Sequence, residues 1–159
     1  MDMSKLFKLQ ISTIEFFVAI SIFLVIVFLI YIFQINKFNE VYNFYEDLLL
    51  QQDLENLEVF LDIEGKPKNW NHSHYEILGL KSEEKIDYEK ILNVKNISYL
   101  KIKENLFVFN EFCIDFEIDR IGNCNFDNSK KVFVRKVIYP IKFENETTIL
   151  KEIKLIVWK

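Results

Sequence analysis

The segment His72-Ser73-His74-Tyr75-Glu76 comes closest to a chemical site by residue type. In an extended segment alternate side chains point the same way, so the two histidines and Glu76 would present ligands of the kind that bind a divalent metal. These are the only histidines in the chain, and no spacing places a further ligand beside them. A solvated loop is the interpretation we favour, and we expect no metal site.

Known catalytic motifs are missing from the sequence. It contains no Walker loop, no His-Glu-x-x-His, no glycine-rich dinucleotide turn and no Gly-x-Ser-x-Gly elbow. With three glycines among 159 residues, few such sites are possible. We therefore expect a protein that is not an enzyme, with no catalytic residues and no cofactor.

The dominant feature is an apolar run. Residues 16–33 read FFVAISIFLVIVFLIYIF, without a charge. At about 1.5 Å per residue, a helix of this length matches a bilayer core of roughly 30 Å. A buried helix of a soluble protein normally keeps a polar stripe, and a removable secretory signal has a shorter apolar run followed by small residues. The sequence instead predicts a transmembrane helix over residues 14–34, with the lipid bilayer as a partner.

The charges beside this run predict its orientation. Lys5 and Lys8 precede it, whereas the next charged residues after Lys37 are acidic. Because cytoplasmic flanks of membrane helices are enriched in Lys and Arg, the leader, residues 1–13, should be cytoplasmic. The protein is then a single-pass protein of the cell membrane, with its C-terminal domain extracellular.

The part beyond the span is acidic. Residues 38–159 carry 17 Lys or Arg and 22 Asp or Glu residues. Binding a nucleic acid needs a concentrated basic patch, and the doublet Lys130-Lys131 is too small to form one. We expect no nucleic-acid partner.

Two cysteines, Cys113 and Cys124, lie in the part placed outside the cell, where oxidising conditions permit a disulfide. Residues 112–119 alternate apolar and polar side chains, which turns Cys113 away from the core. Residues 120–123 carry a turn signal, so we predict that the disulfide closes the end of a hairpin. Two unpaired thiols are the alternative.

Three Asn-x-Ser/Thr sequons also lie beyond the span, at Asn71, Asn96 and Asn145. Each triplet alone is a weak signal. None precedes the span, which agrees with the predicted orientation. We treat the three as candidate glycosylation sites.

The long helix should not end at the membrane surface. Residues 35–62 contain neither Gly nor Pro, and apolar residues recur three or four apart. We expect one helix from about residue 12 to residue 62, with an amphipathic extracellular half covered by the rest of the chain. Gly65 and Pro67 should follow its end, with Trp70 as an apolar plug.

Residues 63–159 should form an extracellular α+β domain. Four segments have β character, and short helices are expected from Ser82 and from Ser98, the second of which fits a strand as well. The segments are residues 106–110, 112–119, 131–139 and 148–158. The predicted fold class is α+β: a long N-terminal helix, transmembrane in one half and amphipathic in the other, packed on an antiparallel β-sheet.

These residues also resemble a known family. A short basic leader joined to Glu15 and an unbroken apolar helix is similar to the N-terminus of type IV pilin-like proteins, especially archaeal ones with class III signal sequences. Gly65-x-Pro67-x-x-Trp70, followed by a Gly-Leu pair and a Tyr, resembles the order in archaeal pilin-like membrane proteins. The likeness covers roughly the first two thirds of the chain.

The resemblance implies a pilin-like fold and a structural role. It implies a leader cut between Gln10 and Ile11, which makes Glu15 the fifth residue, although the family cuts after a small residue and Gln10 departs from this. In the family this glutamate pairs with the amino terminus of a neighbouring subunit, so Glu15 is the candidate assembly residue. Implied partners are other pilin-like subunits and an assembly platform.

The leading hypothesis is a membrane-anchored, pilin-like surface protein, a minor pilin or pseudopilin-type structural subunit of a type IV pilus. The alternative is a single-pass membrane-tethered extracellular binding or accessory domain that does not polymerise.

Overall fold

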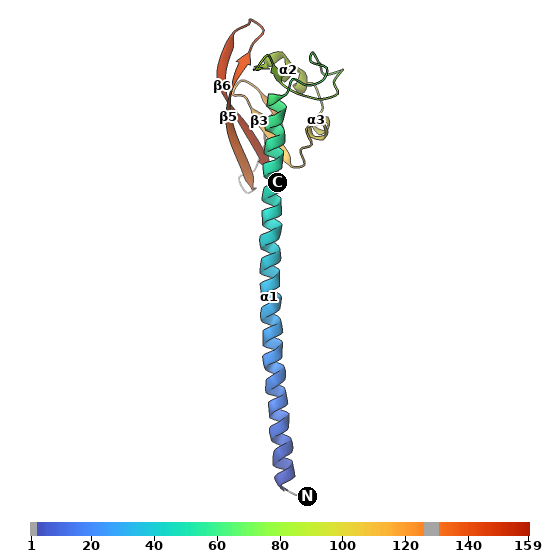
Figure 1. Ribbon diagram of the computed structural model, residues 1–159, viewed down its shortest axis with the longest axis vertical. Coiled ribbons are helices and arrows are strands. Elements are labelled where there is room, and N and C mark those ends of the chain that lie inside the picture. The colour runs from blue at the N-terminus through green and yellow to red at the C-terminus, as the bar shows by residue number, and fades with distance from the viewer. Residues whose placement is uncertain (1–2, 126–130) are drawn as a thin grey trace. The chain divides into compact units, whose positions relative to one another are not determined.

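The computed structural model describes the backbone of residues 3–125 and 131–159 and, within these ranges, the side chains from Glu15 onward. The chain falls into two compact units, residues 1–45 and residues 46–159. Figure 1 labels the elements along the chain.

Helix α1 (Met3–Asp62) begins in the first unit and ends in the second. It starts earlier than the predicted residue 12, since neither Gly nor Pro interrupts residues 3–12. Its end at Asp62 agrees with the prediction. Gly65 follows with a φ of 79°, a conformation that other residues rarely adopt.

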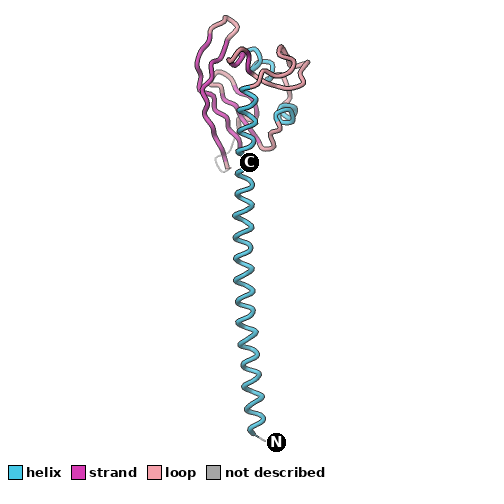
Figure 2. The backbone as a smooth tube through the Cα atoms, viewed as in Figure 1, coloured by secondary structure: helices cyan, strands magenta, loops and turns pink. Residues whose placement is uncertain are grey.

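A six-stranded sheet forms the frame of the second unit, and Figure 2 shows its strands beside the last turns of α1. The strand order is β1-β2-β5-β6-β3-β4. The strands are β1 (Lys81–Ser82), β2 (Lys85–Asp87), β3 (Glu111–Asp115), β4 (Arg120–Gly122), β5 (Val132–Lys142) and β6 (Thr148–Trp158).

The sheet is mixed, so the prediction of an antiparallel sheet is wrong in one place. β2 pairs with β5 in parallel, and every other neighbouring pair is antiparallel. The chain between β2 and β5 contains two helices and the β3–β4 hairpin. A parallel pair needs such a long crossover connection, whereas an antiparallel pair can be joined by a short turn.

Helices α2 (Tyr88–Lys95) and α3 (Tyr99–Leu106) share one apolar core with the end of α1 and one face of the sheet. Asp87 caps α2 by accepting a hydrogen bond from the Glu89 N–H at 3.0 Å. The helix predicted from Ser98 is confirmed as α3. The core side chains include Leu54, Leu57, Phe60, Ile91, Val94, Ile102, Phe112, Ile114, Ile153, Leu155 and Val157.

The helix predicted from Ser82 is wrong, because residues 81–87 form a hairpin of β1 and β2. Its two turn residues, Glu83 and Glu84, have φ values of 51° and 67°. Such turns usually carry Asn or Gly, and two glutamates give no such signal.

Two further local predictions are wrong. Residues 106–110 form the end of α3 and a loop rather than a strand. The turn expected at residues 120–123 lies earlier, where the Phe116 N–H donates to the Asp119 carbonyl at 2.9 Å, and Arg120–Gly122 is strand β4. The strands predicted in residues 131–139 and 148–158 are confirmed as β5 and β6.

The tryptophan plug is confirmed. The Trp70 side chain is buried, and its indole N–H donates to the Gly79 carbonyl at 2.8 Å. A Cβ at position 65 would lie 2.5 Å from the indole nitrogen. Glycine at position 65 therefore serves both the turn and the packing of Trp70.

Candidate functional site

The first candidate site is the apolar surface of α1. Every large apolar side chain from Phe16 to Phe33 is 39–63% exposed. The Ser21 hydroxyl donates a hydrogen bond to the Phe17 carbonyl at 2.8 Å and so has a partner within the helix. Among the described residues this is the one helix long and apolar enough to cross a membrane.

Glu15 directly precedes the apolar run of residues 16–33, and it is exposed. Its carboxylate makes no hydrogen bond or ion pair with the described residues. The side chains of Gln10 and Ile11, the candidate cleavage residues, lie outside the described part of the chain. The place of Glu15 at one end of an apolar helix leaves its carboxylate available to a partner.

An exposed apolar stripe continues along α1 beyond residue 33. Ile35, Phe38, Val41 and Tyr45 are 41–72% exposed and recur three or four residues apart, which places them on one face of the helix. The buried core that α1 shares with the second unit begins at Leu50. The stripe is therefore a surface that a second helix fits.

Within the second unit, α1 holds a loop through a buried carboxylate. Asp53 is fully buried and accepts hydrogen bonds from the Phe109 and Asn110 N–H groups at 3.0 and 2.8 Å, and from the Asn110 side chain at 2.9 Å. The Asn56 amide donates to the Phe107 carbonyl at 2.9 Å. The loop is thereby fixed with the rings of Phe107 and Phe109 facing solvent.

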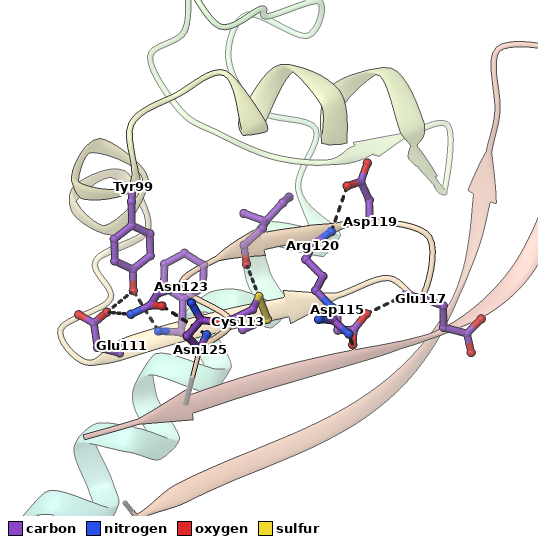
Figure 3. The surroundings of a disulfide bond; sticks show 12 residues. Tyr99, Glu111, Cys113, Asp115, Glu117, Asp119, Arg120, Asn123 and Asn125 are labelled. Carbon is purple, nitrogen blue, oxygen red and sulfur yellow. Dashed lines mark hydrogen bonds and ion pairs between the residues drawn. A yellow bond between two sulfur atoms is a disulfide. The ribbon is translucent and has the colours of Figure 1, made fainter. Parts of the chain in front are cut away.

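The second candidate site surrounds the disulfide, which joins Cys113 in β3 to Cys124 and is drawn in Figure 3. Cys113 lies on the sheet face away from the main core, as predicted, and is nevertheless buried. Its side chain is 2% exposed and packs in a small second cluster with Ile156 and Trp158. The reason is tertiary: the disulfide and the end of β6 cover this part of the face.

A carboxylate network lies beside the disulfide (Figure 3). Glu111 accepts hydrogen bonds at 3.0 Å from the Tyr99 hydroxyl, the Lys103 ammonium and the Asn123 amide. Burial raises the pKa of Glu111, but these bonds outweigh it and hold the pKa below the ordinary 4.5. Burial raises the pKa of the Tyr99 hydroxyl. The network ties α3 to β3 and the segment after β4.

The same sheet face carries an open pocket of about 660 Å³. Its charged lining residues are Asp115, Arg120 and Lys154, neighbours across β3, β4 and β6. Arg120 and Asp115 form an ion pair at 3.4 Å. Lys154 is half-buried and makes no hydrogen bond or ion pair within the described residues. The pocket thus offers one uncompensated cation beside an apolar floor of Ile156 and the disulfide.

The histidine segment does not adopt the extended form that would point His72, His74 and Glu76 the same way. Asn71 and His74 exchange backbone hydrogen bonds of 3.2 and 3.1 Å, which closes a turn. Across residues 15–125 and 131–159, no three His, Cys, Asp or Glu side chains form a group that could hold a metal ion.

The three sequon asparagines are all exposed in the second unit. Asn71 lies in the turn just described, Asn96 follows α2, and Asn145 lies in the loop between β5 and β6. The local geometry therefore differs among the three sequons.

Sequence reasoning did not find the buried polar residues of this unit. Lys90 is 6% exposed, and its ammonium donates to the carbonyls of Glu64 and Lys81 at 2.6 and 2.7 Å. Burial lowers the pKa of Lys90 from its ordinary value. Asp53 and Lys90 look like ordinary surface charges in the sequence, because their partners lie far away along the chain.

No protein-family model, curated protein or solved structure matches this chain. The fold defines an α+β protein in which a long N-terminal helix packs on a curled, mixed sheet. Its apolar N-terminal half is compatible with single-pass membrane anchoring.

Proposed function

We propose that the protein is a membrane-anchored, pilin-like surface subunit of the minor pilin or pseudopilin type. Residues 14–34 anchor it, the N-terminus is cytoplasmic, and the α+β domain is extracellular. In this proposal α1 packs against helices of other pilin-like subunits in a filament or its assembly platform.

The observation that carries the proposal is the exposed stripe of Ile35, Phe38, Val41 and Tyr45. A simple anchor needs only about 20 apolar residues to span the bilayer. Apolar residues on one face of the helix beyond that length favour burial against another helix, because exposed apolar area is costly in water. A domain that is merely tethered to the membrane does not require these additional exposed apolar residues.

Glu15 has a defined role in this proposal. A carboxylate in a packed apolar bundle is stable only with a cationic or hydrogen-bonding partner. The freed amino terminus of a neighbouring subunit, released by a cut between Gln10 and Ile11, is the best such partner. N-terminal sequencing of the membrane-extracted protein reads this cut directly.

The test compares wild type with Glu15→Gln and Phe38→Ser. Loss of the pairing or of the stripe should reduce recovery in sheared surface filaments, or cross-linking to partner helices, by roughly tenfold, which corresponds to about 1.4 kcal/mol. Lys37→Gln, on the same turn but outside the stripe, is the matched control and should assemble normally. Equal assembly of all four proteins, with an uncleaved N-terminus, would favour the tethered domain.

The tethered binding domain remains the second candidate because of the pocket beside the disulfide. Lys154 is an uncompensated cation at its wall, which suits a ligand with an anionic group. Lys154→Gln would abolish such binding without altering filament recovery.

A further inference from the structure

The loop between β5 and β6 has a geometry that singles out one of the three sequons. The Phe143 N–H donates to the Thr147 carbonyl at 3.0 Å, and the Glu146 N–H donates to the Phe143 carbonyl at 2.9 Å. Glu146 has a φ of 63°. This is a type I turn followed by a bulge, with Asn145 at its exposed tip.

The side-chain nitrogen of Asn145 is available for modification. Its oxygen Oδ1 accepts hydrogen bonds from the Thr147 N–H at 3.2 Å and the Thr147 hydroxyl at 2.6 Å. Its nitrogen Nδ2 makes no hydrogen bond within the described residues. The turn therefore fixes the amide by its oxygen and presents the nitrogen outward.

An apolar platform adjoins this nitrogen. Phe143, Asn145, Thr147 and Ile149 line one pocket of about 460 Å³. Tyr88 and Glu144 complete the lining, and the ring centroid of Tyr88 lies 5.1 Å from that of Phe143. A sugar ring carries hydroxyls at its rim and C–H groups on its faces, and aromatic rings bury such C–H faces.

Each of the other two sequons lacks part of this arrangement. The Nδ2 of Asn96 donates to the Leu92 carbonyl at 3.2 Å, and the middle residue of that sequon, Ile97, is buried. Asn71 shares the fixed oxygen, which accepts from the N–H groups of Ser73 and His74 at 3.0 Å each and from the Ser73 hydroxyl at 3.2 Å, so only the platform sets Asn145 apart from it. The residue two before it is Asn69, which supplies no apolar platform.

We propose that Asn145 carries an N-linked glycan whose first sugar packs on Phe143, Tyr88 and Ile149. In the modification, Asn145 Nδ2 attacks C1 of a sugar held on a lipid-linked phosphate donor. The N–C1 bond forms, the C1–O bond to the phosphate breaks, the lipid phosphate leaves with the electron pair, and Nδ2 loses one proton. The inference rests on the proposed extracellular domain, because only that side of the membrane meets the donor enzyme.

A sugar that packs on the folded platform stabilises the folded state selectively, since the unfolded chain offers no such surface. The Tm of the glycosylated protein should exceed that of the unglycosylated protein by about 4 °C. The gain should depend on the platform. Phe143→Leu should leave the glycan attached and remove most of the difference in Tm.

The experiment uses the full-length protein from two sources, the cells that naturally make it and cells without an N-glycosylation pathway. Peptide mass spectrometry measures occupancy at each sequon. We expect higher occupancy at Asn145 than at Asn71 or Asn96, and none at position 145 in Asn145→Gln. The Tm of each form is then compared for wild type, Phe143→Leu and Tyr88→Leu, with Ile138→Leu, an exposed residue of β5 outside the pocket, as the matched control.

Each other outcome overturns the proposal in a recognisable way. An unmodified Asn145 in a protein whose position 71 is accessible from outside overturns the proposal and leaves the proposed function intact. An unmodified Asn145 with position 71 inaccessible overturns both. If glycosylation raises the Tm of wild type and of Phe143→Leu equally, the sugar does not pack on Phe143.

Discussion

At the scale of single residues, buried polar groups decide how loops sit on the helix. Asp53 satisfies two backbone N–H groups that follow α3, and Lys90 satisfies two carbonyls, one in the loop after α1 and one in β1. Each buried charge has hydrogen-bond partners, which is the condition for its burial. These contacts join segments that neither periodicity nor turn chemistry brings together.

The Asp53 contact predicts a large effect on stability. Asp53→Ala leaves the N–H groups of Phe109 and Asn110 without partners and should lower the free energy of unfolding by about 3 kcal/mol. Urea unfolding of the detergent-solubilised protein, followed by the fluorescence of the buried Trp70 and Trp158, measures it. Glu55→Ala, an exposed change on the same helix, is the control and should cost less than about 0.5 kcal/mol. Equal midpoints would contradict the assigned role.

The disulfide makes a second prediction at this scale. Thiol titration of the denatured, unreduced protein should find no free thiol, since Cys113 and Cys124 are joined. Their separation is eleven residues, and a loop of this size should contribute roughly 2 to 4 kcal/mol, mainly by restricting the unfolded chain. The double variant Cys113→Ser, Cys124→Ser should lose that amount. Two titratable thiols per chain would show that the bond does not form.

At the scale of elements, β5 has a long open edge. It pairs with β6 over its whole length, but β2 covers only Ile141 and Lys142 on the other side. Because Phe143 bonds to Thr147, alternation along the strand turns the backbone N–H and C=O groups of the even-numbered residues away from β6. Pro140 has no N–H to offer, and Lys136 lies midway along the open run. Proline and lysine on an edge strand commonly prevent it from pairing with another chain.

We predict that Lys136→Val exposes this edge to pairing. Valine would continue the apolar row of Val134 and Ile138 and remove the Lys136 ammonium, which pairs with Glu152 at 3.1 Å. Light scattering of the detergent-solubilised protein should show self-association at roughly tenfold lower concentration than wild type. Lys136→Arg retains the charge and should behave as wild type. If both variants remain as dispersed as wild type, Lys136 does not prevent pairing at this edge.

At the scale of the whole molecule, the apolar surface of α1 and the disulfide-containing unit call for different surroundings. The exposed side chains of residues 16–33 suit lipid or other helices, whereas a stable disulfide suits an oxidising compartment. A single pass with the N-terminus inside satisfies both requirements.

This arrangement predicts the accessibility of the two ends. A cysteine placed at position 71 should react with a membrane-impermeant maleimide on intact cells, because the proposed topology places this exposed turn outside. Cys113 and Cys124 add no background, since they are joined. A cysteine at position 6, in the leader, is the control and should react only after the cells are permeabilised. The reverse pattern of labelling would invert the topology.

The sequence by itself determined the features that depend on neighbouring residues. The apolar run of residues 16–33, the end of α1 before Gly65, the buried Trp70 and the boundaries of β6 all follow from periodicity or turn chemistry over a few positions. These signals are local, because a helix repeats every 3.6 residues and a strand every two. The same rules failed at Glu83 and Glu84, because this turn lacks the Asn or Gly that usually marks one in a sequence.

The tertiary structure decided which surfaces meet. It made Asp53 and Lys90 buried partners of distant backbone groups, paired β2 with β5 in parallel, and buried Cys113 in a cluster with Ile156 and Trp158. It also placed Tyr88 against the loop of Asn145. A residue's type and spacing give the face on which it lies, but its partner depends on how elements far apart in sequence pack together.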